Sequence, residues 1–256
     1  EVTGAENTPS LSSEPAESSA GLKHLNEVVR VNARLADTVS AAVREGRFPL
    51  VLGGDHSVAI GTIAGLAAHY RNLGVIWFDA HADLNTAETS PSGNIHGMSL
   101  AVSLGRGDPR LTHIHGFAPK LKAERVVIVG ARSLDPGEKE FIRSQGIACY
   151  TMHEIDRMGI ARVMDEAIAR ASDGADGVHL SFDVDSVDPA EAPGTGTPVK
   201  GGVNYREAHF ALERLAEADI VTSAEFVEVN PALDPGRGTP RLAAELICSL
   251  LGKRIL

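Results

Sequence analysis

Aspartate and histidine side chains follow directly after three apolar segments of this sequence, within "LVLGGDHS", "GVIWFDAHAD" and "HLSFDVDSVDP". In an extended backbone, side chains two residues apart point to the same side, so the polar groups of each segment can converge on one point. A buried carboxylate must be ion-paired, hydrogen-bonded or metal-bound, because removing its charge from water costs several kcal/mol. The residues concerned are Asp55, His56, Asp79, His81, Asp83, Asp183 and Asp185.

Each segment alone has a simpler interpretation. The glycines of "GGDH" suit a tight turn, and isolated acidic residues after a strand usually cap a turn or face water. Three such segments together favour a metal site, because carboxylates a few ångströms apart repel one another and a cation relieves that repulsion. The six candidate ligands without Asp55 are too many for one tetrahedral ion and suit two bridged ions, about 3.5–4 Å apart in such sites. Oxygen ligands with two imidazoles and no thiolate favour Mn²⁺ over structural zinc.

The elements that must position these residues alternate between strands and helices. Short apolar runs predict strands at 48–53, 74–79, 125–130, 147–152, 177–184 and 220–229. Helical spacing of apolar residues predicts helices near 21–45, 57–71, 137–145, 160–171, 204–217 and 239–251. This alternation predicts an α/β fold, a three-layer α/β/α arrangement with a mostly parallel central sheet. Ligand sites of such sheets lie at the carboxyl ends of the strands, where the polar residues occur.

Composition narrows the class of protein. The 256 residues can form one large α/β domain over 21–256, after a Ser-, Glu- and Pro-rich flexible lead-in over 1–20. A formal net charge of −10 without any basic stripe argues against nucleic acid as a partner. No apolar run is long enough for a membrane span and no signal-peptide pattern opens the chain, so we expect a cytoplasmic protein. Cys149 and Cys248 match no zinc spacing and are expected to be buried, reduced thiols.

The ordered set of motifs "GGDHS", "DAHADLNT", "SPSGNIHGMS", "SFDVDSVDP" and "EFVEVNP" resembles the ureohydrolases, and specifically the arginase family of bacterial type. The resemblance extends from about residue 21 to the C-terminus. It implies an arginase-like fold, two Mn²⁺ per chain, and hydrolysis of L-arginine to L-ornithine and urea. A water that bridges two dications loses its proton near neutral pH and becomes a nucleophile, which suits attack on a resonance-stabilised guanidinium.

The same resemblance assigns roles to individual residues. His56 and Asp83 would complete one metal site, His81 and Asp185 the other, and Asp79 and Asp183 would bridge both ions. His96 would transfer protons, Glu228 would orient the guanidinium, and Asp83 would count among the catalytic groups as well as the ligands. Thr197 would be a hydroxyl partner near Glu228. Neutral donors suited to the α-carboxylate are Asn85, Ser92 and Asn94, and acceptors suited to the α-ammonium are Asp135 and Glu138. "DPGE" could equally start a helix, with Asp135 as its cap.

Two features depart from the family pattern. Ser133 stands where some members carry another aspartate, and the family's opening strand and glycine-rich loop have no counterpart, which would leave residues 48–53 as an exposed edge strand. Two alternatives therefore remain: a ureohydrolase for agmatine or another guanidino compound, and a catalytically silent metal-binding assembly module. The resemblance also implies a homo-oligomer, a hexamer or trimer, with Arg206 and Glu207 in its interface; otherwise both residues simply face water from an amphipathic helix.

Overall fold

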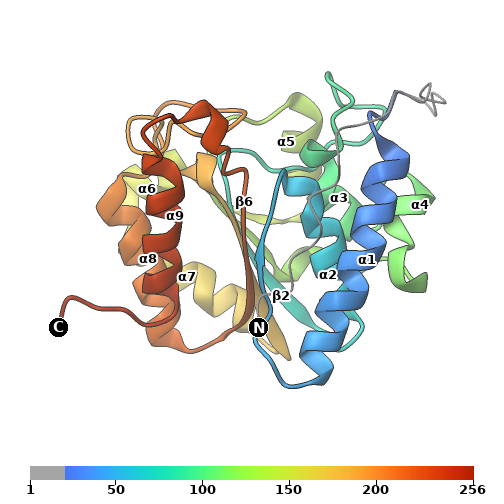
Figure 1. Ribbon diagram of the computed structural model, residues 1–256, viewed down its shortest axis with the longest axis horizontal. Helices are drawn as coiled ribbons and strands as arrows, with labels where there is room; N and C mark the ends of the chain where they lie inside the picture. The colour runs from blue at the N-terminus through green and yellow to red at the C-terminus, as the bar shows by residue number, and fades with distance from the viewer. Residues whose placement is uncertain (1–20) are drawn as a thin grey trace.

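The computed structural model describes residues 21–256, and the predicted lead-in of residues 1–20 lies outside them (Figure 1). A parallel sheet of six strands crosses the centre of the described chain in the order β1-β6-β5-β2-β3-β4. The strands are β1 (Leu50–Leu52), β2 (Leu73–Phe78), β3 (Val126–Ala131), β4 (Ala148–Thr151), β5 (Gly177–Asp183) and β6 (Val221–Val227). The predicted α/β/α fold class is confirmed, and every strand pair is parallel.

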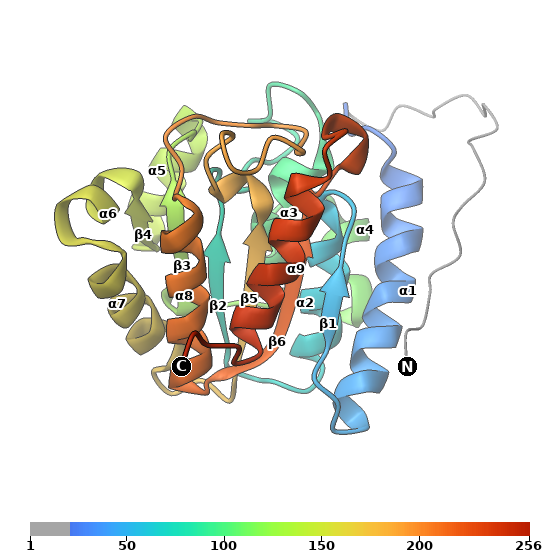
Figure 2. The same ribbon diagram turned by 60° about the vertical axis from the view of Figure 1, so that its left-hand side comes forward.

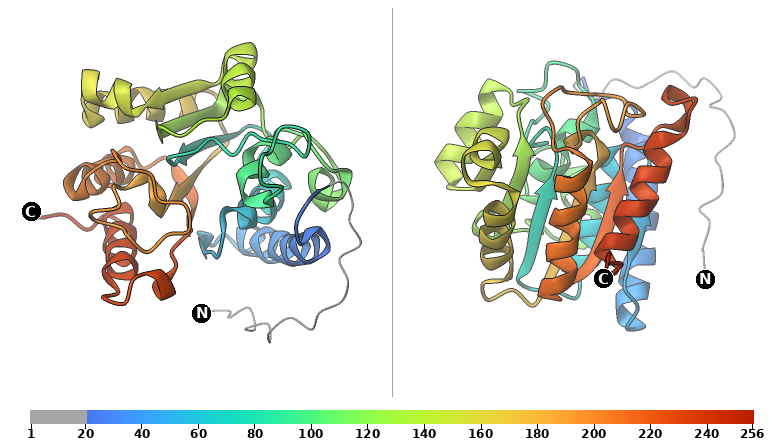
Figure 3. Two further views of the ribbon diagram at one scale, coloured as in Figure 1. Left: turned by 90° about the horizontal axis from the view of Figure 1, so that it is seen from above. Right: turned by 90° about the vertical axis from the view of Figure 1, so that its left-hand side faces the viewer.

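Helices cover both faces of the sheet, as Figures 2 and 3 show from the side and from above. One layer contains α1 (Leu25–Arg44), α2 (Ala59–Ala67), α3 (Ser99–Ser103), α4 (Pro109–Thr112) and α5 (Pro136–Gln145). The other contains α6 (Met152–Met158), α7 (Ile160–Ser172), α8 (Tyr205–Ala218) and α9 (Gly238–Leu250). Because both faces are covered, β2, β3 and β5 are buried along their whole length and consist largely of β-branched and aromatic residues.

Alternation along the strands sends side chains to two separate cores. Phe182 of β5 packs between Phe78 and Phe226 at ring-centroid distances of 5.2 and 5.1 Å, beneath α7, α8 and α9. Trp77 of β2 faces the opposite core, beneath α2 and α3. On that side α2 packs so closely against α1 that no side chain fits at Gly65. A Cβ there would lie only 2.5 Å from the carbonyl oxygen of Ala36.

The predicted strands and long helices are all present, with ends within a few residues of the expected ones. Three short helices, α3, α4 and α6, were not predicted, because four to seven residues are too few to show a helical period. Met152, expected at the end of a strand, instead begins α6, where Thr151 and Glu154 form a capping box. Parallel pairing could not be assigned residue by residue from sequence, since its register depends on partners far along the chain.

One expectation about the cysteines was wrong. Cys248 is exposed, since it lies on the outer side of α9, away from the face that Leu246 and Leu250 bury. Cys149 on β4 is half-buried, and burial raises the pKa of its thiol to about 12. Both thiols are free.

Strand β1 lies at the edge of the sheet. Within the described chain it pairs with β6 alone, and Leu52 is 70% exposed, which agrees with the expected edge strand. At the centre of the sheet, by contrast, β5 and β2 are neighbours and both end at the edge that carries the candidate ligands. Along residues 21–256, no helix combines the length and the apolar character that crossing a bilayer requires.

Candidate metal centre

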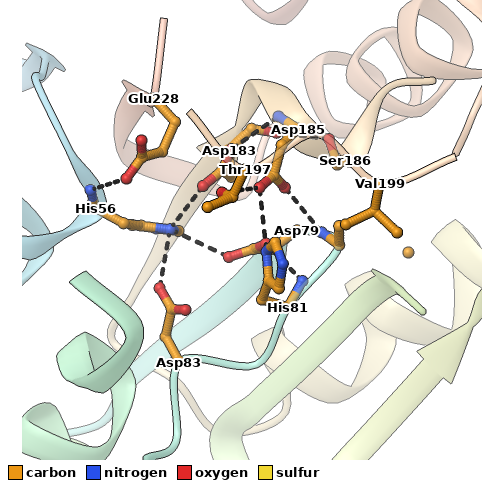
Figure 4. Close-up of polar contacts among 12 residues, drawn as sticks. His56, Asp79, His81, Asp83, Asp183, Asp185, Ser186, Thr197, Val199 and Glu228 are labelled. Carbon is orange, nitrogen blue, oxygen red and sulfur yellow. Dashed lines mark hydrogen bonds and ion pairs between the residues drawn. The ribbon is translucent and has the colours of Figure 1, made fainter. Parts of the chain in front are cut away.

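The candidate ligands meet at the carboxyl ends of β2 and β5, and His56 faces Asp79, Asp83 and Asp183 from the side (Figure 4). Phe78 pairs with Phe182 across these two strands, so Asp79 and Asp183, each the next residue, stand side by side. His56 begins the short 3-10 turn η1 (His56–Val58) that follows β1, and Asp55 caps this turn through the backbone N–H of Ser57. The parallel topology therefore brings together residues that lie far apart in the sequence.

The first cluster surrounds the buried imidazole of His56. Its Nδ1 lies 3.1 Å from one carboxylate oxygen each of Asp79, Asp83 and Asp183. One nitrogen cannot make three well-directed hydrogen bonds, and within residues 21–256 neither His56 Nδ1 nor Asp83 Oδ2 has a hydrogen-bond partner although both atoms are buried. Buried polar atoms are normally satisfied, so this arrangement fits a site in which a cation occupies the space between these atoms.

The second cluster contains Asp79, His81 and Asp185. His81 Nδ1 lies 3.1 Å from Asp185 Oδ2 and 3.4 Å from Asp79 Oδ1. Asp79 thus belongs to both clusters, one oxygen toward each histidine. Asp183 belongs to the first cluster, and its other oxygen accepts the backbone N–H of Asp185 at 2.7 Å. All six residues predicted as ligands lie in one connected site.

Neighbouring donors hold these ligands in orientation. The indole Nε1 of Trp77 donates to Asp79 Oδ2 at 2.9 Å, and its ring stacks on His56 with centroids 4.1 Å apart and planes 6° from parallel. Thr197 donates its hydroxyl to Asp185 Oδ2 at 3.1 Å. Such contacts fix which lone pairs of a ligand face the metal.

The charges of the clustered groups shift one another's pKa values. Burial lowers the pKa of His81, but hydrogen bonds to Asp185 and Asp79 outweigh it and raise that pKa to about 11. In the same way the surrounding aspartates raise the pKa of His56 well above its usual value despite complete burial. Burial and neighbouring negative charge also raise the pKa of Asp83 and Asp183. Without a cation the site therefore retains protons, and a divalent cation would compete with them.

Two acidic residues of the site have left-handed backbone angles, φ 52° at Asp83 and φ 61° at Glu228. A non-glycine residue in this region is strained by about 1–3 kcal/mol and persists only where its surroundings hold it. The carbonyl oxygen of Asp83 accepts N–H groups from Leu100 and Ala101, at the start of α3. The N–H of Glu228 donates to the carbonyl of Gly54 at 2.8 Å.

His96 and Glu228 form a contact beside the first cluster. His96 Nδ1 lies 3.1 Å from Glu228 Oε1, and the same oxygen accepts the backbone N–H of His56 at 2.7 Å. The hydrogen bond that Glu228 accepts from His96 raises the pKa of His96, although burial opposes it. His96 is not among the clustered candidate ligands.

A cavity opens above the clusters and contains most of the residues predicted to bind substrate. Its lining is His81, Asp83, Asn85, Ser90, Pro91, Ser92, His96, Gly97, Ser133, Asp135, Glu138, Asp183 and Thr197. Asn94 lies instead in a second cavity, together with Glu228, and the two cavities share His96. Asn94 thus lines a different cavity from Asn85 and Ser92, although its backbone N–H donates to Ser92 Oγ at 3.1 Å.

The "DPGE" segment both begins a helix and lines the cavity. Asp135 caps α5, and its own backbone N–H donates to Glu138 Oε2 at 2.8 Å. The second oxygen of Glu138 accepts the N–H of Leu84, next to the ligand Asp83, at 3.0 Å. Asn85 donates its amide to Asp135 Oδ2 at 2.9 Å. Both acidic residues still line the cavity, so they begin a helix and face the site at once.

Several side chains that organise the site were not predicted. Besides Trp77, Arg132 donates from its guanidinium to four backbone carbonyls, those of Gly130, Asp185, Ser186 and Val199. Ser181 and Glu225 lie directly beneath His56. Polar residues alternating with apolar ones inside the buried strands "GVHLSFD" and "VTSAEFV" were the signal for the last two.

The expected interface residues lie on the first turn of α8. Arg206 is 54% exposed at its side chain and pairs with Glu213 of the same helix at 3.2 Å. Glu207 completes a capping box with Asn204. Their place in an assembly stays a prediction.

The sequence and the fold both match known proteins. The model of the arginase family matches residues 16–252. The chain belongs to the arginase family. It is 61% identical to the arginase of Bacillus caldovelox over 235 residues, which cover 92% of this chain and 79% of that protein. The arginase of Brevibacillus brevis is 62% identical over 234 residues, covering 91% and 78%.

Solved structures agree with the sequence relatives. The crystal structure of arginase from Bacillus cereus superposes with a TM-score of 0.91 at 61% identity and covers 92% of this chain and 81% of that one. The family membership that the motifs suggested is therefore confirmed, and this arginase-family chain carries two adjoining groups of candidate metal ligands.

We expect metal binding to release protons. The raised pKa values of His56 and His81 keep both imidazoles protonated at pH 7, so a cation must displace those protons and its affinity should rise as the pH increases from about 6 to 8. Calorimetric titration of Mn²⁺ into chelator-treated protein, in buffers of different ionisation enthalpy, measures the number released. The His96→Ala variant should release as many, whereas no release from the unaltered chain would contradict the expectation.

Proposed function

We propose that this chain hydrolyses L-arginine to L-ornithine and urea with two Mn²⁺ ions bound per chain. The observation that carries the proposal is the convergence of six histidine and aspartate side chains, three of which (His81, Asp83 and Asp183) line a cavity with an acidic wall. Family membership supports the reaction class. The donor set, carboxylate oxygens and imidazoles without thiolate, suits manganese.

The ligands divide between the two ions as follows. His56 and Asp83 would hold one ion, His81 and Asp185 the other, and Asp79 and Asp183 would contact both. Two bound dications supply a hydroxide from water at neutral pH and balance the four negative charges of the aspartates. The chain itself keeps the ligands oriented through Trp77 and Thr197.

The substrate would extend from the metal floor to the mouth of the cavity. Glu228 places a negative charge beside His56 and can orient the N–H groups of a guanidinium. At the other end Asp135 and Glu138 provide acceptors for an α-ammonium, while Asn85 and Ser92 are polar partners for an α-carboxylate, with Asn94 beside them in the adjoining cavity. This end distinguishes arginine from agmatine, which lacks the α-carboxylate.

His96 is positioned to handle protons during the reaction. Its imidazole lies at the boundary of the two cavities and is held by Glu228. A protonated His96 can give its proton to the amine that leaves when the C–N bond breaks, and then recover one from solvent. The raised pKa of His96 favours the protonated form that this step requires.

A urea assay tests the reaction. With Mn²⁺ present, we expect the unaltered chain to release urea from L-arginine far faster than from agmatine. Asp183→Asn should lose both the metal and the activity, because the substitution removes a buried ligand charge from the site. A chain that binds manganese but releases no urea from any guanidino compound would favour the alternative of a metal-binding assembly module. Preference for agmatine would favour the other ureohydrolase.

Replacing His96 separates proton transfer from metal binding. We expect His96→Ala to lower kcat by about 10²–10⁴-fold, the usual contribution of a general acid or base, while two Mn²⁺ remain bound. Activity comes from the urea assay and metal content from elemental analysis. His113→Ala, at an exposed histidine after α4, should leave both unchanged. Loss of manganese from His96→Ala would make His96 a ligand and contradict its role.

We also propose that the chain works as a cytoplasmic homo-oligomer, a hexamer or trimer. Two free thiols suit a reducing compartment. As an exposed pair, Arg206 and Glu213 would contribute only about 0–1 kcal/mol, but a neighbouring subunit that covers Arg206 would make its charge essential. Light scattering at micromolar concentration should show the oligomer, and Arg206→Ala should lower its mass. A monomer, or an undiminished mass in the variant, would contradict this assignment.

A further inference from the structure

A row of buried polar side chains runs beneath the metal centre and takes no part in the reaction described above. His179 and Ser181 of β5 stand opposite Ser223 and Glu225 of β6 in the parallel register. All four are fully buried, with no exposed surface. A carboxylate in such a place is costly unless it has a specific partner, so Glu225 requires an explanation.

Hydrogen bonds connect Glu225 to a candidate metal ligand. Ser181 donates its hydroxyl to Glu225 Oε1 at 2.7 Å, and the same hydroxyl oxygen lies 2.8 Å from His56 Nε2. An ionised glutamate only accepts hydrogen bonds, and a serine hydroxyl has a single hydrogen to give. Because Ser181 gives that hydrogen to Glu225, its oxygen must accept the Nε2–H of His56.

This direction of bonding determines the tautomer of His56. With its proton on Nε2, the neutral imidazole has its free lone pair on Nδ1, the atom that lies 3.1 Å from three aspartates. A hydroxyl turned the other way would donate to Nε2 and place the proton on Nδ1, where it would block a cation. The stacked indole of Trp77 fixes the plane of the ring but not its tautomer.

His179 supplies a partner for the buried carboxylate. Its Nε2 lies 3.4 Å from Glu225 Oε1, and its Nδ1 lies 2.9 Å from the hydroxyl of Ser223. Burial raises the pKa of Glu225, but the proximity of His179 outweighs burial and lowers that pKa below its usual value. The carboxylate of Glu225 therefore remains available to accept the hydrogen bond from the hydroxyl of Ser181.

We propose that Glu225 is a positioning residue that acts through Ser181 to hold His56 in the tautomer that binds metal, with His179 beside its carboxylate. The inference rests on the metal site of the proposed function. Outer partners of this kind commonly change metal affinity by about 10–100-fold, by fixing the tautomer and raising the basicity of the ligand. Glu225 touches neither substrate nor metal.

Calorimetric titration of Mn²⁺ into chelator-treated protein tests the proposal without any measurement of turnover. Glu225→Gln should weaken one of the two binding steps by about 10–100-fold and leave the step that involves His81 unchanged. At two equivalents of Mn²⁺, the electron paramagnetic resonance spectrum should lose the signal of a coupled pair and show single ions. A merely structural role would lower stability and weaken both steps alike.

Ser181→Ala provides a second variant that removes only the hydroxyl and keeps Glu225 paired with His179. If Glu225 acts through Ser181, the two substitutions combined should weaken manganese binding no more than either alone. The matched control is Ser103→Ala, at a buried serine whose hydroxyl donates to the carbonyl of Ser99, away from the site. That variant should bind both ions as the unaltered chain does.

The outcomes separate this inference from the proposed function. Unchanged binding of both ions in Glu225→Gln and Ser181→Ala, or effects that add in the double variant, would overturn the positioning role even if the chain hydrolyses arginine. Selective, non-additive weakening would support that role even in a chain that released no urea. The urea assay alone decides the reaction.

Discussion

The burial of four aspartates at one site is the constraint on which the rest of this structure depends. Asp79, Asp83, Asp183 and Asp185 are all buried at one edge of the sheet, where their repulsion would be prohibitive without compensating groups. Compensation comes from two imidazoles, from backbone N–H groups and from the indole of Trp77. A bound cation would complete it. The strained backbone at Asp83 and the many hydrogen bonds around it are consequences of bringing these groups so close together.

Much of this could be predicted from the sequence, because charge at strand ends is a local signal. The alternation in "FDAHAD" and "FDVDS" located the ligands, and apolar runs located the strands. The start of α5 followed from a capping residue, Asp135. These features depend on neighbours only a few residues away.

Contacts between distant segments could not be predicted in the same way. Arg132 joins carbonyls more than 50 residues away in the sequence, and the stacking of Trp77 on His56 joins different layers. The division of Asn85 and Asn94 between two cavities depends on how the loop folds over the sheet. Glu138 has a double role because the start of α5 packs against the ligand loop, which no local pattern reveals.

The direct pairing of β2 with β5 fixes the spacing of two aspartates at the metal centre. Since neighbouring strands lie about 4.7–4.9 Å apart, the separation of Asp79 and Asp183 is set by backbone hydrogen bonds and not by the loops above. The loops that form the cavity can therefore lengthen, shorten or change sequence while the spacing of these carboxylates stays constant. New substrate preferences could evolve on such a scaffold without any need to rebuild the part that activates water.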